Sequence, residues 1–468
     1  MKSKSSIVFY PFYIFDQFLI AFSFFPKIKL KKRIFDSKVL FLCFFLISLP
    51  LQAHNIHITS IHELLKTHPE IEYIKCYDAQ PFAYEPFPLS TFPELQPHTG
   101  LLAETFIAKI PQGQVSSYRG WIKVDDVIIS EFIPPYGSLS YHEQALTLYD
   151  FNNPTKISGK VAVITMLFDT TYCHWIWNIL GRLALLEIQG IEYDWLYVPY
   201  DLPFMKESLA LWGIDSAKII TPFGATKHII ADELIVPSHI GNRTPEPHQY
   251  VMNWVPVQEF NQNWNLATKN LHIWSNFIYP KVDICPKNIA PHNYFLRYAP
   301  LCSVYFCQWG IQHIRNKFLS HVENNNYHFA KKIFISRKDS TKRVLTNEDE
   351  LFSLFEPLGF KKYIAGSMSV QEQIALFHGA DIIVAAHGSA LTNALFAQPG
   401  TTIIEIYQNR SDSCFYYLSQ LLDLHHFCIQ TMDFLSIDSY ENTCVDKTII
   451  QQFITEHQSL FTEKEKHA

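Results

Sequence analysis

The stretch DIIVAAHGSALTN, residues 381–393, decides the fold. Residues 381–386 are apolar after the aspartate and predict a buried strand. His387-Gly388-Ser389 then forms a small-residue turn, and a helix is expected over 389–397. In a parallel sheet, such a turn offers backbone N–H groups and a positive helix end to a phosphate. Gly388 would let the backbone approach a ligand closely. The alternative is an ordinary turn whose histidine bonds locally.

The same alternation of strands and helices continues on both sides of this stretch. An acidic first turn after Thr346 and a capping box of Ser369 with Glu372 predict two helices. Short connections between such units imply a parallel, doubly wound α/β sheet. Arg337 and His387 each follow a strand and should share the carboxyl edge of the sheet, with Glu405 near the end of its own strand. The expected strands are 332–335, 360–364, 382–386 and 401–407, and the expected helices are 346–355, 369–377, 389–397 and 415–422.

These residues, in this order, resemble glycosyltransferase family 61. The resemblance covers roughly residues 110–430, and Ala390 departs from it because many members carry a second glycine there. The matching elements downstream are Ser336-Arg337, Arg343, Asn347-Glu348, Leu358-Gly359-Phe360, Gln373, His387-Gly388, Leu391-Thr392-Asn393, Phe396 and Ile404-Glu405. The matching elements upstream are His174-Trp175, Asn178 and Arg182-Leu183.

The resemblance implies a GT-B-like α/β architecture, in which two Rossmann-like lobes face a central cleft. It also implies an inverting transfer of a sugar from a nucleotide-sugar donor, with the diphosphate on the C-terminal lobe and the acceptor on the N-terminal lobe. The chain has no Asp-x-Asp triplet, so we expect cationic side chains to hold the diphosphate, with no metal and no cofactor beyond the donor. The predicted donor-binding residues are Arg337, Arg343, His387, Gly388, Ser389, Leu391, Asn393 and Glu405.

An inverting transfer needs a general base for the acceptor hydroxyl. His174 is the first candidate, because an imidazole suits proton abstraction at neutral pH, and Asp169 could orient it or act as the base itself. Each assignment has a structural alternative: His174 could simply pack, Arg182 could pair with Glu187, and Glu405 could pair with a lysine. The other predicted cleft residues are Asn178, Arg182, Asn347 and Gln373.

Composition narrows the function classes. The net charge is −6, and the first 38 residues hold eight Lys/Arg against two Asp, so the remainder is near −12. Such a chain lacks the basic surface that a nucleic-acid partner requires. No Gly-x-Gly-x-x-Gly follows a strand, which disfavours an NAD-dependent enzyme. We expect a nucleotide sugar and a glycan, lipid-linked or protein acceptor as partners, as in polysaccharide biosynthesis. The alternative is a catalytically inactive, nucleotide- or carbohydrate-binding relative.

The N-terminus predicts a hydrophobic leader over residues 1–53. A basic run at 27–38 precedes a compact apolar stretch at 39–49, which describes a secretory signal or a membrane anchor. The apolar stretch is short for a spanning helix of about 20 residues, and a buried leader in a cytosolic enzyme is the alternative. We therefore expect the enzyme at a membrane or in the secretory pathway. The sequence does not decide on which side of the membrane it lies. The predicted organisation is 1–53 leader, 54–129 small β-rich region, 130–325 acceptor-binding lobe, and 326–468 donor-binding lobe with a C-terminal helix.

Overall fold

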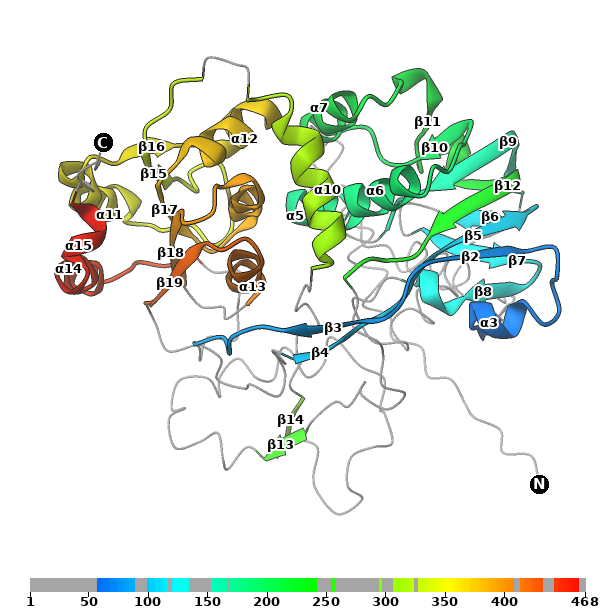
Figure 1. Cartoon of the computed structure of the whole chain (residues 1–468), viewed down its shortest axis with the longest axis horizontal. Helices are drawn as coiled ribbons and strands as arrows, with labels where there is room; N and C mark the ends of the chain where they lie inside the picture. Colours follow the sequence, from blue (N-terminus) through cyan, green and yellow to red (C-terminus); the bar gives the residue numbers. More distant parts are fainter. Residues whose placement is uncertain are drawn as a thin grey trace, which may run out of the picture. The chain divides into compact units, whose positions relative to one another are not determined.

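The second half of the chain forms a parallel, five-stranded sheet (Figure 1), and the turn at His387 follows the carboxyl end of its central strand. The computed structural model describes residues 57–88, 99–116, 120–133, 153–166, 169–241, 254–256, 294–296, 306–323, 327–407, 413–431 and 442–462. The predicted leader, residues 1–53, lies outside them. Among the described residues, every helix is too short or too polar to cross a bilayer.

The parallel sheet has the strand order β16-β15-β17-β18-β19. The chain leaves β15 toward one edge and returns on the other side of β15 with β17, so the order reverses between β15 and β17. Ligands of doubly wound sheets bind beyond the carboxyl ends of the strands at this reversal. The strands are β15 (Lys332–Ile335), β16 (Lys361–Tyr363), β17 (Ile382–Ala386), β18 (Thr402–Tyr407) and β19 (His425–Gln430).

Local sequence signals placed most elements of this half. β15 and β17 have the predicted bounds, and the Ser369–Glu372 capping box forms both of its hydrogen bonds at the start of α12. The segment after His387 is a 3-10 helix, η10, rather than the expected α-helix. β19 had no prediction. The α-helices among the described residues of this half are α11 (Glu348–Phe355), α12 (Val370–Gly379), α13 (Cys414–Leu421), α14 (Lys447–Glu456) and α15 (Gln458–Phe461), and η10 covers Ser389–Phe396.

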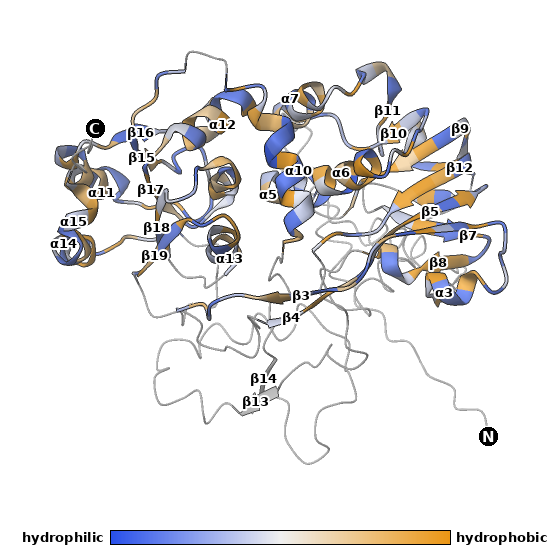
Figure 2. Ribbon diagram, in the orientation of Figure 1, coloured by the Kyte–Doolittle hydropathy of each residue, from blue (hydrophilic) through white to orange (hydrophobic). Residues whose placement is uncertain are grey.

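The first half of the chain forms a ten-stranded mixed sheet. Its strands β12, β9, β10 and β11 run parallel in that order, while β5 and β6 pair with β12 in the antiparallel sense. Figure 2 shows β12 as mainly hydrophobic, as expected for a mostly buried strand. The strands are β1 (His57–Thr59), β2 (Glu72–Tyr77), β5 (Thr105–Pro111), β6 (Gln114–Ser116), β7 (Trp121–Val124), β8 (Val127–Ile129), β9 (Thr155–Val163), β10 (Trp195–Tyr197), β11 (Ile219–Ile220) and β12 (His228–Pro237).

This mixed sheet crosses the domain boundary that the sequence suggested at 129/130. Strands from the predicted β-rich region and from the predicted first lobe lie in one sheet, so residues 57–129 and 153–237 share a core. The mixed pairing also differs from an all-parallel Rossmann-like lobe. Two small antiparallel pairs stand apart: β3 (Gln80–Ala83) with β4 (Thr99–Leu102), and β13 (Trp254–Pro256) with β14 (Tyr294–Leu296).

Helices between the two sheets carry a continuous apolar core. Trp175, Leu183 and Phe318 belong to the same buried cluster as Ile383 and Leu391 of the second half. The run from Tyr172 to Ile188 consists of α5 (Tyr172–His174), a π-helical segment η3 (Trp175–Ile179) and α6 (Leu180–Ile188). The other α-helices among the described residues of this half are α3 (Ile61–Leu64), α7 (Pro203–Trp212) and α10 (Gln308–Leu319). Short π-helical segments occur frequently at functional sites.

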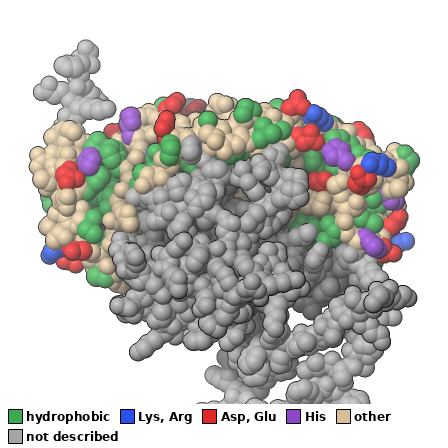
Figure 3. Space-filling view, turned by 90° about the horizontal axis from the view of Figure 1, so that it is seen from below, with side chains coloured by type: hydrophobic (Ala, Val, Ile, Leu, Met, Phe, Trp, Pro, Cys, Tyr) green, Lys and Arg blue, Asp and Glu red, His purple; other side chains and the backbone are tan. Residues whose placement is uncertain are grey.

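The surface is consistent with the charge analysis. On the face in Figure 3, the Lys and Arg side chains of the described residues lie singly beside Asp or Glu rather than in a patch. Lys362 and Lys338 are likewise paired with an acidic side chain, since both bind Asp349.

Candidate active site

Arg337 and His387 meet at the strand-order reversal. Arg337 follows β15, His387 follows β17, and these two strands are neighbours. A Cβ built on Gly388 would overlap the Arg337 guanidinium, so the missing side chain is what admits the arginine. The φ of Gly388 is 170°, an extended value that other residues adopt, and the glycine is therefore needed for space rather than for backbone conformation. The structure thus brings a cation against the predicted turn.

Backbone carbonyls of the following loop hold the Arg337 side chain. Its Nε donates to the Arg343 carbonyl at 3.0 Å, and its Nη2 donates to the Lys342 carbonyl at 3.1 Å. Arg343 adopts a left-handed backbone with φ 54°, which is uncommon outside glycine. Burial, and then repulsion from Arg343, lowers the pKa of Arg337 to about 10. The guanidinium therefore remains charged at neutral pH, beside a second arginine.

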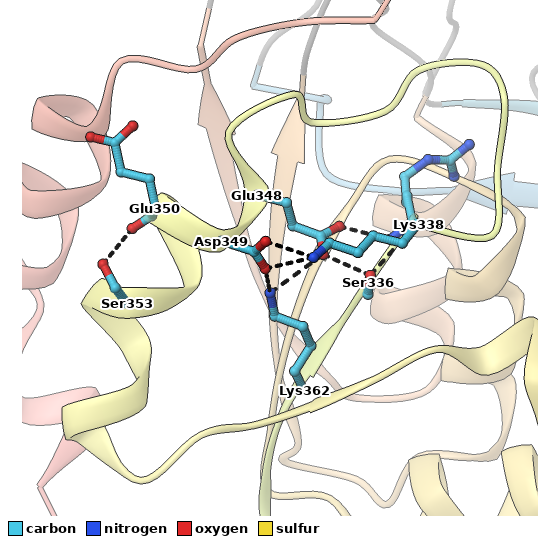
Figure 4. Close-up of polar contacts among 8 residues, drawn as sticks. Ser336, Lys338, Glu348, Asp349, Glu350, Ser353 and Lys362 are labelled. Atoms are coloured by element: carbon cyan, nitrogen blue, oxygen red, sulfur yellow. Dashed lines mark hydrogen bonds and ion pairs between the residues drawn. The ribbon is translucent and has the colours of Figure 1, made fainter.

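Glu348, at the start of α11, bonds to the residues that follow β15 (Figure 4). This buried carboxylate accepts from the Ser336 hydroxyl at 2.6 Å and from the Arg337 backbone N–H at 2.9 Å. Lys362 lies 3.5 Å from its Oε1 and also binds Asp349, which accepts from Lys338 as well. Sequence reasoning named Glu348 as an acidic residue in a first helical turn and as part of the family resemblance, without giving it a role. Its contacts show that it positions the Arg337 backbone.

Glu405 lies under His387 and away from solvent. The carboxylate is 0 % exposed; its Oε1 lies 2.5 Å from His387 Nδ1, and its Oε2 lies 3.0 Å from His426 Nε2 and 2.7 Å from the Tyr407 hydroxyl. Burial alone would raise the pKa of Glu405, but the His387 and His426 rings hold it down at about 2. The prediction that Glu405 contacts a donor hydroxyl is therefore wrong, as is the alternative of a lysine partner. His426 and Tyr407 had no sequence signal.

The short helix α5, which carries His174, contacts the same turn from the first half of the molecule. Its neighbour Cys173 lies 3.9 Å from the Ser389 hydroxyl, and the Tyr172 hydroxyl donates to Asn393 at 2.7 Å. The Nδ1 of His174 lies 3.1 Å from the Asn178 side-chain carbonyl, one helical turn on. Because a carbonyl only accepts, the proton belongs on Nδ1 and the basic lone pair on Nε2. His174 is partly exposed, as an acid–base group must be.

Three of the predicted site residues lie in the interior, and a fourth, Asn347, is half-buried. Leu391 is 0 % exposed in the core, and Asn393 is 0 % exposed, with its amide bonded to Tyr172, Gln373 and the Ala390 carbonyl. The side chain of Gln373 accepts this bond from Asn393 and donates to the Met368 carbonyl. Asn347 binds both backbone groups of Val445. Their contacts with the protein position the turn and the α11 segment.

Arg182 is a structural residue, contrary to both predictions for it. It is 1 % exposed and donates twice to the Pro237 carbonyl, at 2.9 and 2.7 Å, and once to the Thr165 carbonyl at 2.9 Å. Glu187, its proposed partner, binds Lys317 and His313 instead. Burial lowers the pKa of Arg182 to about 9, which leaves it charged at neutral pH.

Replacing Arg182 with methionine should therefore lower stability rather than donor affinity. The change leaves two buried carbonyls without their donor, at a cost of about 1–3 kcal/mol each. Urea unfolding should show a loss of about 2–5 kcal/mol, with Lys317→Met on the α10 surface as the control. If the variant unfolds like the parent but binds nucleotide more weakly, Arg182 is a binding residue and not a structural one.

The side chain of Asp169 is buried and does not reach solvent. It is 0 % exposed and accepts from the Thr165 hydroxyl at 2.5 Å, and its second oxygen, Oδ1, has no hydrogen-bond partner among the described residues. Desolvation raises the pKa of Asp169 to about 7, against partial lowering by the Thr165 hydrogen bond. The side chain turns to Thr165, while Asn178 orients His174.

The raised pKa of Asp169 predicts a pH-dependent stability penalty. The unfolded carboxyl loses its proton near pH 4 and the folded one near pH 7, so the free energy of unfolding falls as pH rises between these values. Asp169→Asn removes the titration and keeps an acceptor for Thr165. Its stability advantage over the parent should grow by about 3 kcal/mol between pH 5 and pH 8 in urea unfolding. An advantage that does not change with pH would contradict the assignment.

Among the described residues, no group of three or more His, Cys, Asp or Glu is placed to hold a metal ion. A small, shallow pocket lies beside η3, the segment that follows His174. It is lined by Trp177, Asn178, Ile240, Gly241, Phe306, Cys307 and Ile311.

Comparison with known families gives one result. The family model described as Glycosyltransferase 61 matches residues 172–404, about half of the chain. The match begins at Tyr172, where α5 meets the turn, and continues through Arg337 and His387 to β18. No curated protein matches the chain. The matched segment holds both elements that converge on the turn, and the chain therefore belongs to glycosyltransferase family 61 and is a glycosyltransferase.

Proposed function

We propose that this enzyme is an inverting glycosyltransferase with a GT-B arrangement, and that its second half holds the diphosphate of a nucleotide-sugar donor. The observation that carries the proposal is the Arg337 guanidinium against Gly388, at the reversal of a parallel sheet. Open α/β sheets bind ligands there. A planar guanidinium beside a side-chain-free backbone can reach two phosphate oxygens at once.

The charges of the site suit a leaving diphosphate. Arg343 lowers the pKa of Arg337, which means that two cations repel each other in the protein alone. An anion between them would relieve that repulsion. Negative charge develops on the diphosphate as the glycosidic bond breaks, so fixed cations stabilise the transition state more than the ground state. Arg337, Arg343 and His387 would supply this stabilisation in place of a divalent ion.

His174 is the proposed general base. Its Nε2 would take the proton of the acceptor hydroxyl, and the oxygen would attack the anomeric carbon from the face opposite the diphosphate. The new carbon–oxygen bond then forms as the bond to the phosphate oxygen breaks, and the diphosphate leaves with the electron pair. Asp169 is the weaker candidate because it is 0 % exposed, whereas a base must come within hydrogen-bond reach of its substrate.

The acceptor would lie over α5 and the first half, opposite the donor. The contact between Cys173 and Ser389 supports this arrangement, because it joins the two elements where the substrates would meet. A glycan or lipid-linked acceptor would fit the predicted leader, which would keep the enzyme at a membrane.

Calorimetry with UDP, GDP and their sugars tests this function. Binding of one nucleoside diphosphate, followed by sugar transfer or donor hydrolysis that survives EDTA treatment, is the expected result. Failure of the parent protein to bind any nucleotide would reject the donor assignment. Loss of activity in EDTA, restored by a divalent ion, would reject the metal-independent mechanism and leave the fold assignment intact.

A further inference from the structure

A buried polar cluster lies under the donor turn, and the transfer step above uses only one of its members, His387. It consists of His387, Glu405, Tyr407 and His426, contributed by the end of β17 and by β18 and β19. Glu405 accepts from the two histidines and the tyrosine, and Tyr407 also stacks on His387 with ring centroids 5.4 Å apart. Glu405 is 0 % exposed, and the His426 side chain is 2 % exposed. The cluster therefore cannot contact a substrate except through His387.

The hydrogen-bond partners of the two ring nitrogens of His426 indicate that the ring is positively charged. The Ser419 hydroxyl donates its single hydrogen to the Phe415 carbonyl at 2.8 Å, so it accepts from His426 Nδ1 at 2.7 Å. His426 Nε2 faces the Glu405 carboxylate, which only accepts. Both ring nitrogens of His426 then carry protons, and His426 and Glu405 form a buried ion pair.

The same carboxylate fixes the proton of His387. Its Oε1 faces Nδ1, so Nδ1 carries a proton, and the opposite ring nitrogen, Nε2, points away from the carboxylate. Carboxylates hold catalytic and metal-binding histidines in one tautomer and orientation in this way. The ring is further held between Tyr407 and Phe415.

We propose that Glu405 and His426 are positioning residues for donor binding: their buried ion pair holds His387 so that Nε2 is presented to the diphosphate. This inference rests on the proposed function, because it gives His387 a phosphate to bind. A purely structural role explains the cluster less well. A buried ion pair contributes little to stability compared with apolar side chains of similar volume. Tyr407 and Phe415 already supply the packing around the ring.

Binding of UDP and GDP to single variants tests the proposal without any chemical step. Glu405→Gln lets an amide donate to Nδ1, and the proton of His387 is then no longer fixed. We expect its dissociation constant for the bound nucleotide to rise about 10-fold or more, as with other second-layer partners. His426→Gln, which cannot supply the positive charge, should weaken binding in the same direction. It also keeps the proposal testable if Glu405→Gln does not fold. Tyr197→Phe, which removes a buried tyrosine hydroxyl from β10 of the first half, where it donates to the Thr226 and Lys227 carbonyls, is the control and should bind like the parent.

A double variant shows whether Glu405 acts through His387. If it does, Glu405→Gln with His387→Gln binds nucleotide no worse than His387→Gln alone, because coupled residues are not additive. ¹⁵N spectra of histidine-labelled protein should place a proton on His387 Nδ1 in the parent and lose that signature in Glu405→Gln. If His387→Gln weakens binding while Glu405→Gln and His426→Gln bind as tightly as the parent, the positioning role is refuted and the donor site stands. If the parent binds no nucleotide, the proposed function itself fails.

Discussion

Replacing His174 with glutamine should abolish sugar transfer and leave donor binding intact. Glutamine keeps a polar side chain beside Asn178 but cannot take a proton from the acceptor. General-base catalysis contributes about 10²–10⁴-fold, and kcat should fall by this factor. The dissociation constant for the nucleoside diphosphate should not change, because the proposed phosphate ligands, Arg337 and Arg343, come from the other half of the chain. Single-turnover assays and calorimetry on the same preparation separate the two quantities.

His313→Gln is the matched control for this experiment. His313 is also a helical histidine next to a hydrogen-bonding partner, Glu187, but it lies on α10 away from the turn. Asn178→Ala should lower kcat less than His174→Gln, since it only releases the Nδ1 proton and the base remains. Should His174→Gln retain full turnover while Asp169→Asn loses it, the base is Asp169, and the π-helical segment has another role.

Local sequence chemistry predicted the second half well because its signals are local. The apolar runs of β15 and β17 are buried on both faces, and the capping box of Ser369 and Glu372 needs only residues of one helical turn. The carboxyl edge of a parallel sheet then followed from topology alone. Arg337 and His387 were correctly expected on one edge, because each directly follows a strand.

Glu405 shows where such reasoning stops. A carboxylate inside an apolar strand gives no indication of its partners, and its partners are His387, Tyr407 and, from a strand that no pattern predicted, His426. β19 reads HHFCIQ, which is too polar at its start to be recognised as a buried strand. Only the pairing of β18 with β19 places that histidine beside the glutamate.

The predictions for Arg182 and for the first sheet were wrong for the same reason. The partners of Arg182 are the backbone carbonyls of Pro237 and Thr165. Every residue has a backbone carbonyl, so the amino-acid sequence does not indicate which carbonyls an arginine will bind. β5 and β12 pair across a long separation in sequence, so the mixed sheet could not be read from either strand alone. Periodicity finds strands, but it does not say which strands pair.

Removing the Arg337 side chain should give the largest loss of donor affinity. A hydrogen bond between charged groups contributes about 1.5–3 kcal/mol, so Arg337→Ala should weaken nucleoside diphosphate binding about 10- to 100-fold. Arg337→Lys keeps the charge but loses the planar fork and should recover only part of the affinity. Calorimetry with UDP and GDP measures all three proteins.

Gly388→Ala tests the same site with the arginine left in place. The backbone at Gly388 is extended and accepts an alanine, but the added methyl would occupy the space of the Arg337 guanidinium. Donor affinity should therefore fall although no charge is lost. Gly379→Ala, at the end of α12, is the matched control, because a Cβ there meets nothing within 4 Å. Arg343→Gly removes the second cation and suits the left-handed backbone at φ 54°, so the carbonyl that holds Arg337 Nε stays in place. If Gly388→Ala and Arg337→Ala both bind nucleotide like the parent, the anion lies elsewhere, and the arginine beside the turn serves only to close the loop between β15 and α11.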